Sequence, residues 1–303
     1  MDQGGQGGVP RLVGDGVAGG GELLLCFEDR FLAGGGSGAA TGRPRMPDRQ
    51  VINGMAYKIR TGVSRRDLPE RYGPGKTLCT RFRRYALDGV FTRALQQIQA
   101  QADATGDIDW LVQTDSTIVR AHQHAAATGR KGGAAGDEPD DHALGRSRGG
   151  LTAKIHLACD GKGRPLAVLV TPGRRHDSIC ARPLLERIRV PRAGLGRPRC
   201  RPDQVIADKA HSSRGFRAYL RKRGIAHTIP EKTDQRRHRL GRGHRGGRPP
   251  AFNRDVSRQR NMVERCFNRL KGFRGIATRY EKTAVSYEAA VALASSLFWA
   301  RSV

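Results

Sequence analysis

The chain has 303 residues, which is enough for one large domain or two modest ones. Its 55 Lys and Arg residues outnumber 28 Asp and Glu residues, which gives a net charge of +27 and an isoelectric point near 11.1. This excess of positive charge predicts a polyanionic partner, with nucleic acid as the leading candidate. No apolar run approaches the length of a membrane-spanning helix, and no basic helix carries a large apolar face, so we expect no membrane partner.

The cysteines argue against a disulfide-stabilised or zinc-binding protein. None of them forms a Cys-x-x-Cys pair, and no secretory signal precedes them. We therefore predict reduced thiols in a cytoplasmic protein. The cysteines are Cys26, Cys79, Cys159, Cys180, Cys200 and Cys266.

Residues 1–40 are rich in Gly and predict a flexible arm. Residues 41–106 predict a small helical region, because apolar residues recur at helical spacing between turn residues. The arginines of this region fall on the outward side of its helices. The arrangement resembles a helix-turn-helix DNA-binding unit, although a plain helical cap on the next domain accounts for it equally well. The predicted helices span 49–60, 77–87 and 91–102.

From residue 107 to residue 303, short apolar strands alternate with helices, which suits an α/β domain with a mixed five-stranded sheet flanked by helices. The predicted strands cover 110–115, 151–159, 165–171, 204–208 and 225–229. The predicted helices cover 181–189, 213–224, 258–271 and 286–301. Residues 232–253 are rich in Arg and Gly, and for them we predict a loop that is disordered without its partner and clamps phosphate. The arginines assigned to this clamp are Arg236, Arg237, Arg242 and Arg245.

Two aspartates, Asp115 and Asp208, end apolar strands, and Glu264 lies beside the apolar stripe of the predicted helix 258–271. If the strands are neighbours and the helix packs on their sheet, the carboxylates meet. Such hard oxygen donors suit Mg²⁺ or Mn²⁺, and two ions could activate water and stabilise the leaving oxygen of a phosphodiester. The alternative is that both aspartates are strand-end turn residues and that Glu264 only pairs with Arg260 or Asn268 on a solvated helix face.

Four blocks of sequence carry the most specific signal in the chain. They are QTDSTIVRAHQH from Gln113, GRSRGGLTAKIH from Gly145, IADKA from Ile206 and RNMVERCFNRLK from Arg260. In this order they resemble the DDE transposases of bacterial insertion sequences, and the match is to the fifth insertion-sequence family. The resemblance covers about residues 41–301 and implies a ribonuclease-H-like catalytic core.

The resemblance also implies the roles of individual residues. Asp115, Asp208 and Glu264 would be the catalytic, metal-binding triad. Arg260 and Lys271 belong to the signature around the glutamate and would contact DNA phosphate near the cleaved end.

The reaction implied is hydrolysis of a phosphodiester at each element end, followed by attack of the freed 3′-hydroxyl on target DNA. The partner is therefore double-stranded DNA, and because element ends come in pairs we expect a homodimer on DNA. Lys154, in the second block, is assigned to the DNA-binding surface. In a bacterium we expect such a protein to be associated with the nucleoid.

The chain departs from the family pattern at Ser257 and His211, where the family usually has Tyr, and it lacks tryptophans usual around Arg65 and Gly75. Two other hypotheses follow. The first is a catalytically inactive DNA-binding relic or regulator that occupies element ends. The second is a ribonuclease-H-like nuclease that cuts strands but does not join them.

Two motifs that contain histidine have open roles. We expect His122 and His124 to face DNA or to be structural, because no third metal ligand is nearby in the sequence. His176 and Asp177 either orient the catalytic site or form a turn.

Overall fold

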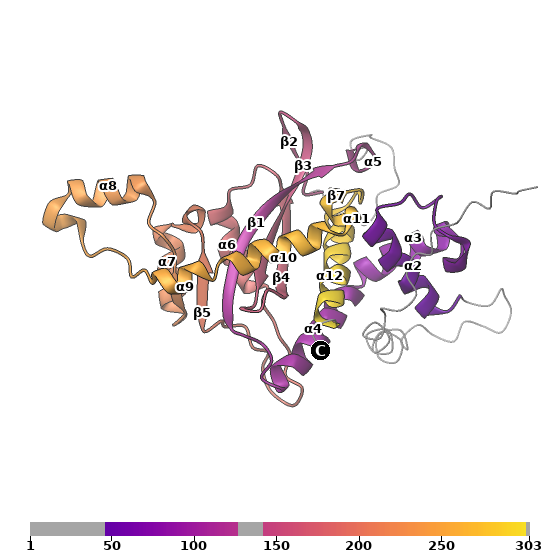
Figure 1. Cartoon of the computed structure of the whole chain (residues 1–303), viewed down its shortest axis with the longest axis horizontal. Coiled ribbons are helices and arrows are strands. Elements are labelled where there is room, and N and C mark those ends of the chain that lie inside the picture. The colour runs from indigo at the N-terminus through magenta and orange to yellow at the C-terminus, as the bar shows by residue number, and fades with distance from the viewer. Residues whose placement is uncertain (1–45, 127–141, 301–303) are drawn as a thin grey trace, which may run out of the picture.

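The computed structural model describes residues 46–126 and 142–300 of the chain, so the predicted arm lies outside the described residues. A mixed sheet lies at the centre, helices α2 and α3 lie at one end of the molecule, and helix α8 projects from the other end (Figure 1). The strands are β1 (Leu111–Ala121), β2 (Gly145–Ser147), β3 (Gly150–Cys159), β4 (Pro165–Pro172), β5 (Gln204–Ala207), β6 (Ala226–Thr228) and β7 (Thr278–Arg279). The helices are α2 (Asp48–Thr61), α3 (Gly75–Leu87), α4 (Val90–Ala104), α5 (Gln123–Ala126), α6 (Asp177–Glu186), α7 (Arg214–Lys222), α8 (Thr233–Gly241), α9 (Arg254–Arg258), α10 (Asn261–Lys271), α11 (Arg274–Ala277) and α12 (Ala284–Ala300), with 3₁₀ turns η1 (Glu70–Tyr72), η3 (Lys209–His211) and η4 (Gly243–Gly246). None of the helices in this described part of the chain combines the length and apolarity needed to cross a membrane.

The sheet follows the strand order β2-β3-β1-β5-β6, with β4 also paired to β3 and β7 to β1. Strand β1 is antiparallel to β3 and parallel to β5, and β5 is parallel to β6. This mixed α/β sheet flanked by helices confirms the predicted fold class and is consistent with a ribonuclease-H-like core. The predicted count of five strands is wrong, since the described residues form seven. The two additional strands, β2 and β7, are short and contain no large apolar residue, so they leave no strand pattern in the sequence.

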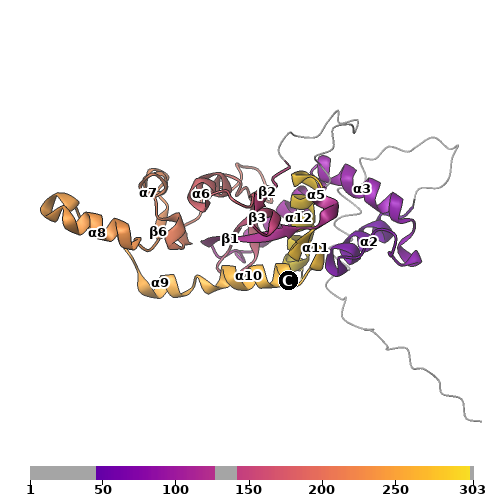
Figure 2. The same cartoon turned by 90° about the horizontal axis from the view of Figure 1, so that it is seen from above.

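Both faces of the sheet are covered by helices. Figure 2 shows α6 and α7 on one side of the sheet and α9 and α10 on the other. On β3, Ala153, Ile155 and Leu157 are buried, as the alternation predicts, and His156 and Ala158 on the opposite face are buried as well. Polar side chains on these strands must therefore find hydrogen-bond partners inside the protein.

Helix α12 joins the N-terminal helices to the sheet. It is apolar on all sides, as expected of a buried helix, and packs against α3, α4 and β4. Its Trp299 Nε1 donates a hydrogen bond to the carbonyl oxygen of Pro165 at 2.7 Å, and Gln99 Nε2 of α4 donates to the same oxygen at 3.0 Å. These contacts fix α4 to the first residue of β4.

The structure corrects the loop predicted at 232–253, because α8 and η4 lie within it. Ser212 Oγ donates to Gln235 Oε1 at 2.8 Å, which ties the base of α8 to the protein. Further along α8, Arg239 pairs with Glu231 at 3.0 Å. No side chain of α8 is buried, so the sequence lacks the apolar stripe by which a helix is recognised.

A buried ion pair closes the hairpin between β3 and β4. Asp160 and Arg164 are 0% and 2% exposed, and Arg164 Nη2 lies 2.7 Å from Asp160 Oδ2. The guanidinium also pairs with Asp107 and lies 4.0 Å from the ring centroid of Trp299. The hairpin turn therefore connects the end of α4, the sheet and α12 through one cation.

We expect Asp160→Ala to lower the free energy of unfolding by about 3 kcal/mol, because Arg164 would stay buried without its main partner. The retained pairing with Asp107 keeps the loss at the lower end of the range for broken buried ion pairs. Urea unfolding followed by circular dichroism measures the change. Asp203→Ala, at a carboxylate that is 69% exposed, is the control, and equal losses in the two variants would contradict the prediction.

Candidate active site

The pairing of β1 with β5 places Asp115 beside Asp208. The strands are parallel, and the last pair in register is Thr114 with Ala207. Asp115 and Asp208 follow directly, so they stand level on neighbouring strands, which lie about 4.8 Å apart in a sheet. The side chains are 22% and 26% exposed. The prediction that Asp115 ends its strand is wrong, because β1 continues to Ala121 through its pairing with β3 and β7.

Helix α10 carries Glu264 across one face of the sheet. Its buried side chains include Val263, Phe267 and Leu270, which form the predicted apolar stripe. The Val263 N–H donates a hydrogen bond to Gln113 Oε1 at 3.1 Å. The first turn of the helix is therefore fixed to β1 two residues before Asp115.

Arg260 lies between α9 and α10, and its guanidinium bridges two of the carboxylates. Nη1 is 3.8 Å from Asp115 Oδ2, and Nη2 is 3.0 Å from Glu264 Oε1. The helix predicted at 258–271 is thus interrupted, with α9 ending and α10 beginning on either side of Arg260. The ion pair between Glu264 and Arg260, one of the sequence alternatives, is present in the structure.

The predicted cluster of three carboxylates is only partly assembled. In the residues that the structure describes, no three His, Cys, Asp or Glu side chains are placed to hold a metal ion together. Asp115 and Asp208 meet, while Glu264 is held by Arg260. The donors nevertheless fit a hard divalent cation, because they are carboxylates whose mutual repulsion is relieved by a positive charge, here the charge of Arg260.

The two aspartates differ in pKa. Burial raises the pKa of Asp115, and the charge of Asp208 raises it further, against a hydrogen bond from the Ser116 N–H and the charge of Arg260. Burial also raises the pKa of Asp208, but the His211 ring at 2.7 Å and two backbone amides outweigh it, so this pKa lies below its usual value. Asp208 is therefore the more readily ionised carboxylate, and Asp115 gains more from a nearby cation.

A hydrogen-bonded network supports Asp115 through the next residue of β1. The Ser116 N–H donates to Asp115 Oδ1 at 2.8 Å, and Ser116 Oγ donates to Asp177 Oδ1 at 2.7 Å. Asp177 is the first residue of α6, where His176 caps the helix. Of the two roles considered for this motif, the structure favours the one that orients the site.

Two basic side chains are enclosed in the same network. Lys154 Nζ donates to Asp177 Oδ1 at 3.1 Å and to the Arg175 carbonyl at 2.9 Å, and its side chain is only 12% exposed. These contacts compensate the charge of Lys154 inside the protein, and its DNA-binding role stays a prediction. His156 bonds Thr171 Oγ1 at 2.9 Å, and burial lowers the pKa of His156 to about 4.

The other predicted DNA-binding residues outside Arg260 are exposed. They are Arg236 and Arg237 on α8, Arg242 and Arg245 beside it, and Lys271 in the last turn of α10. A cavity of about 420 Å³ beside Asp208 adds Lys209, Arg254 and Arg258, which the sequence reasoning missed. These three basic residues are close in sequence to Asp208 or Arg260, and that closeness could have indicated them.

Residues 109–299 match the family described as Transposase DDE domain. The chain belongs to the DDE transposase family. Members of this family cleave DNA and transfer the cut strand in a reaction that depends on divalent metal. Residues 30–95 of the transposase also match a family described as "Putative transposase of IS4/5 family". The predicted resemblance to insertion-sequence transposases is confirmed.

Curated relatives carry related descriptions. The transposase is 30% identical to "Putative transposase for insertion sequence element IS6501" of Brucella ovis over 151 residues, which cover 50% of this chain and 100% of that protein. It is 31% identical to "Putative transposase for insertion sequence element IS402" of Burkholderia cepacia over 149 residues, 49% of this chain and 60% of that protein. It is 39% identical to "Uncharacterized protein y4sN" of Sinorhizobium fredii over 104 residues, 34% of this chain and 78% of that protein. No solved structure gave a significant match.

Two of the departures from the family pattern, His211 and Ser257, lie at this site of the transposase. His211 is buried, and its ring nitrogen Nδ1 lies within hydrogen-bond distance of the Asp208 carboxylate. Ser257 lines the cavity beside Asp208. Neither residue removes a carboxylate, and His211 fixes the orientation of one.

The stability of the transposase is expected to fall between pH 6.5 and about 4 in part through His156, whose pKa is lowered across this range. The unfolded chain binds the proton first in that window, so unfolding becomes more favourable as the pH falls. One such group gives a slope of at most about 1.4 kcal/mol per pH unit. Urea unfolding above and below the window should show a smaller loss for His156→Gln, and an equal loss would contradict the assignment.

We expect Arg260→Met to lower the midpoint of thermal unfolding by about 2–4 °C without metal, because Asp115 and Glu264 lose their shared cation. The same variant should gain more than the parent from added Mn²⁺, since the ion meets less competition for the carboxylates. Differential scanning fluorimetry measures both. Arg182→Met, at an exposed arginine paired with Glu186 on α6, is the matched control, and an identical response to Mn²⁺ in both variants would argue against competition.

Proposed function

We propose that Asp115, Asp208 and Glu264 are the catalytic carboxylates of this transposase and that they hold two Mg²⁺ or Mn²⁺ ions. The observation that carries the proposal is the level placement of Asp115 and Asp208 on neighbouring parallel strands. The first turn of α10, which carries Glu264, is fixed to β1 by the hydrogen bond from Val263 to Gln113. Glu264 would join the two aspartates once Arg260 releases it.

The carboxylates supply binding and orientation in this proposal. Two cations bound there would lower the pKa of a water and stabilise the leaving oxygen of the phosphodiester. Asp208 is held in place by His211, and Asp115 by the amide of Ser116. Arg260, once it releases Glu264, lies where it can donate to a phosphate of the DNA end.

The chemistry needs no nucleophile from the protein. Water cleaves the element end, and the 3′-hydroxyl that results attacks the target phosphodiester in line, so both transfers proceed without a covalent enzyme intermediate. Cys266 on α10 is the thiol nearest in sequence to Glu264, and burial raises its pKa to about 12. It stays protonated near neutral pH and is unsuited to attack.

The DNA surface proposed here combines three parts. The arginines of α8 and η4 form one part, Lys271 and the basic cavity beside Asp208 form the second, and the helical region 41–106 forms the third. A net charge of +27 favours this long contact with phosphates. Because element ends come in pairs, we propose a homodimer in which each protomer holds one inverted repeat.

Asp208→Asn is expected to reduce strand cleavage and joining by roughly a thousandfold or more, because it removes a metal ligand that supports several kcal/mol of transition-state stabilisation. The assay uses labelled duplexes carrying the inverted repeats that flank the gene, with Mn²⁺ and then Mg²⁺. Joined products separate a transposase from a nuclease that only cuts.

Asp203→Asn is the matched control, since this carboxylate lies just before the same strand, is 69% exposed and pairs with Arg199. It should cleave and join like the parent. If Asp208→Asn joined DNA strands as efficiently as the parent protein, the assignment of the catalytic centre would be wrong. End binding without cleavage by the parent protein would favour the inactive relic or regulator.

A further inference from the structure

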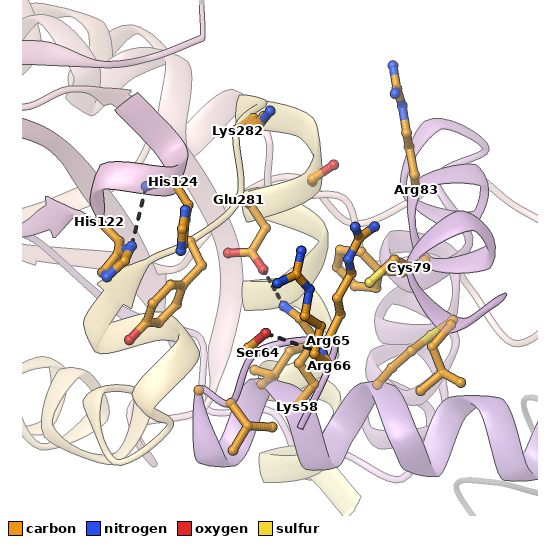
Figure 3. A pocket seen from close by; sticks show the side chains of 18 of the residues that line it. Lys58, Ser64, Arg65, Arg66, Cys79, Arg83, His122, His124, Glu281 and Lys282 are labelled. Atoms are coloured by element: carbon orange, nitrogen blue, oxygen red, sulfur yellow. Dashed lines mark hydrogen bonds and ion pairs between the residues drawn. The ribbon is translucent and has the colours of Figure 1, made fainter. Parts of the chain in front are cut away.

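A second large cavity lies between the helical end of the molecule and the far end of β1. Its volume is about 830 Å³, within the range of sites that hold a small organic ligand. Its walls come from α2 and the residues that follow it, from α3, from the segment after β1 and from the segment before α12. Figure 3 shows side chains from these segments facing one another across the cavity.

The charge of this cavity is strongly positive. Its Lys and Arg residues number five against one carboxylate, Glu281. Lys58 pairs with that carboxylate at 3.2 Å, which ties α2 to the segment before α12. Arg65, Arg66 and Lys282 are exposed at the edge of the cavity. A rim of this kind attracts phosphate.

Aromatic and apolar side chains line part of the cavity beside the ion pair. The ring centroids of His122 and Tyr280 lie 4.9 Å apart at an interplanar angle of 37°, and those of His122 and His124 lie 4.7 Å apart at 41°, so these tilted rings form one aromatic wall. Ile59 and Phe82 contribute apolar surface. Aromatic rings beside a cationic rim are the combination by which proteins hold unpaired nucleotides, since every base has a face to stack.

We propose that this cavity binds an unpaired nucleotide of the DNA. The phosphate lies on the rim formed by Arg65, Arg66 and Lys282, and the base lies against the wall formed by Tyr280 and His122. A paired base cannot enter, because it is already stacked within its duplex. A duplex backbone would need only the rim and would leave the ring wall unused.

The cavity lies within reach of DNA held at the catalytic carboxylates. His122 follows Asp115 by seven residues along the β1 direction, a distance of about 23 Å at the usual rise of a strand. That is roughly seven steps of a duplex, less than one helical turn. The inference rests on the proposed function only in taking DNA as the ligand.

The first test is binding by fluorescence anisotropy in EDTA, with a blunt duplex and with the same duplex carrying an unpaired tail. Tyr280→Ala should weaken binding of the tailed duplex roughly 5- to 150-fold and leave the blunt duplex unchanged. Tyr219→Ala, a half-buried tyrosine on α7 that stacks on Phe216, is the matched control and should change neither. Arg65→Ala and Lys282→Ala should each flatten the salt dependence of tail binding by about 0.7 in the log–log slope.

The second test uses a thiol already in the cavity and needs no change to its walls. Cys79 lines the cavity and is half-buried, and Cys200 is half-buried elsewhere. Alkylation by iodoacetamide, followed by mass spectrometry, should slow at Cys79 and not at Cys200 when the tailed duplex is added. The blunt duplex should protect neither thiol.

Three results would overturn the proposal. They are equal affinity of Tyr280→Ala and the parent for the tailed duplex, equal weakening for both duplexes, or unchanged alkylation of Cys79. The second would mean that the ring wall contacts duplex DNA rather than an unpaired base. Because no metal is present, these measurements do not depend on cleavage, and a failure of the catalytic assignment would leave them unaffected.

Discussion

The parallel register between β1 and β5 is the constraint on which the site depends. A shift of one residue along either strand would turn one aspartate to the opposite face of the sheet and separate the pair. The register is fixed by burial, because Val205, Ile206 and Ala207 of β5 are fully buried and β6 pairs with its edge. The core of the transposase thus decides the position of two carboxylates that are themselves partly exposed.

Electrostatics sets the state of that site before DNA or metal arrives. Three carboxylates in one region repel one another, and in this chain an arginine compensates two of them while a histidine holds the third. The side chains of Arg260 and His211 thereby offset the repulsion among the carboxylates, and both side chains can move. The basic surface around them adds to the same effect and also attracts the substrate, so affinity for DNA and tolerance of the acidic cluster have one origin.

Much of this arrangement could be predicted from the sequence, and the failures have physical reasons. Apolar runs and alternation located β1, β3, β4, β5 and β6, and apolar residues at helical spacing located the helix that carries Glu264. Alternation could not show that β1 continues beyond Asp115, because Ile118 in that part is exposed and interrupts the pattern. It also could not detect α8, which buries no side chain. The cavity near Tyr280 was out of reach, since its walls come from segments that are distant in the chain.

The joint at Pro165 has a consequence for where the DNA is cut. Two side chains from different helices meet at one carbonyl oxygen of β4, and α12 packs against both the helical end and the sheet. DNA bound to the helical end would therefore be held by a rigid spacer at a set distance from the carboxylates. The fixed distance between the helical end and the carboxylates would then determine which phosphodiester is cut, relative to the sequence that the helical end binds.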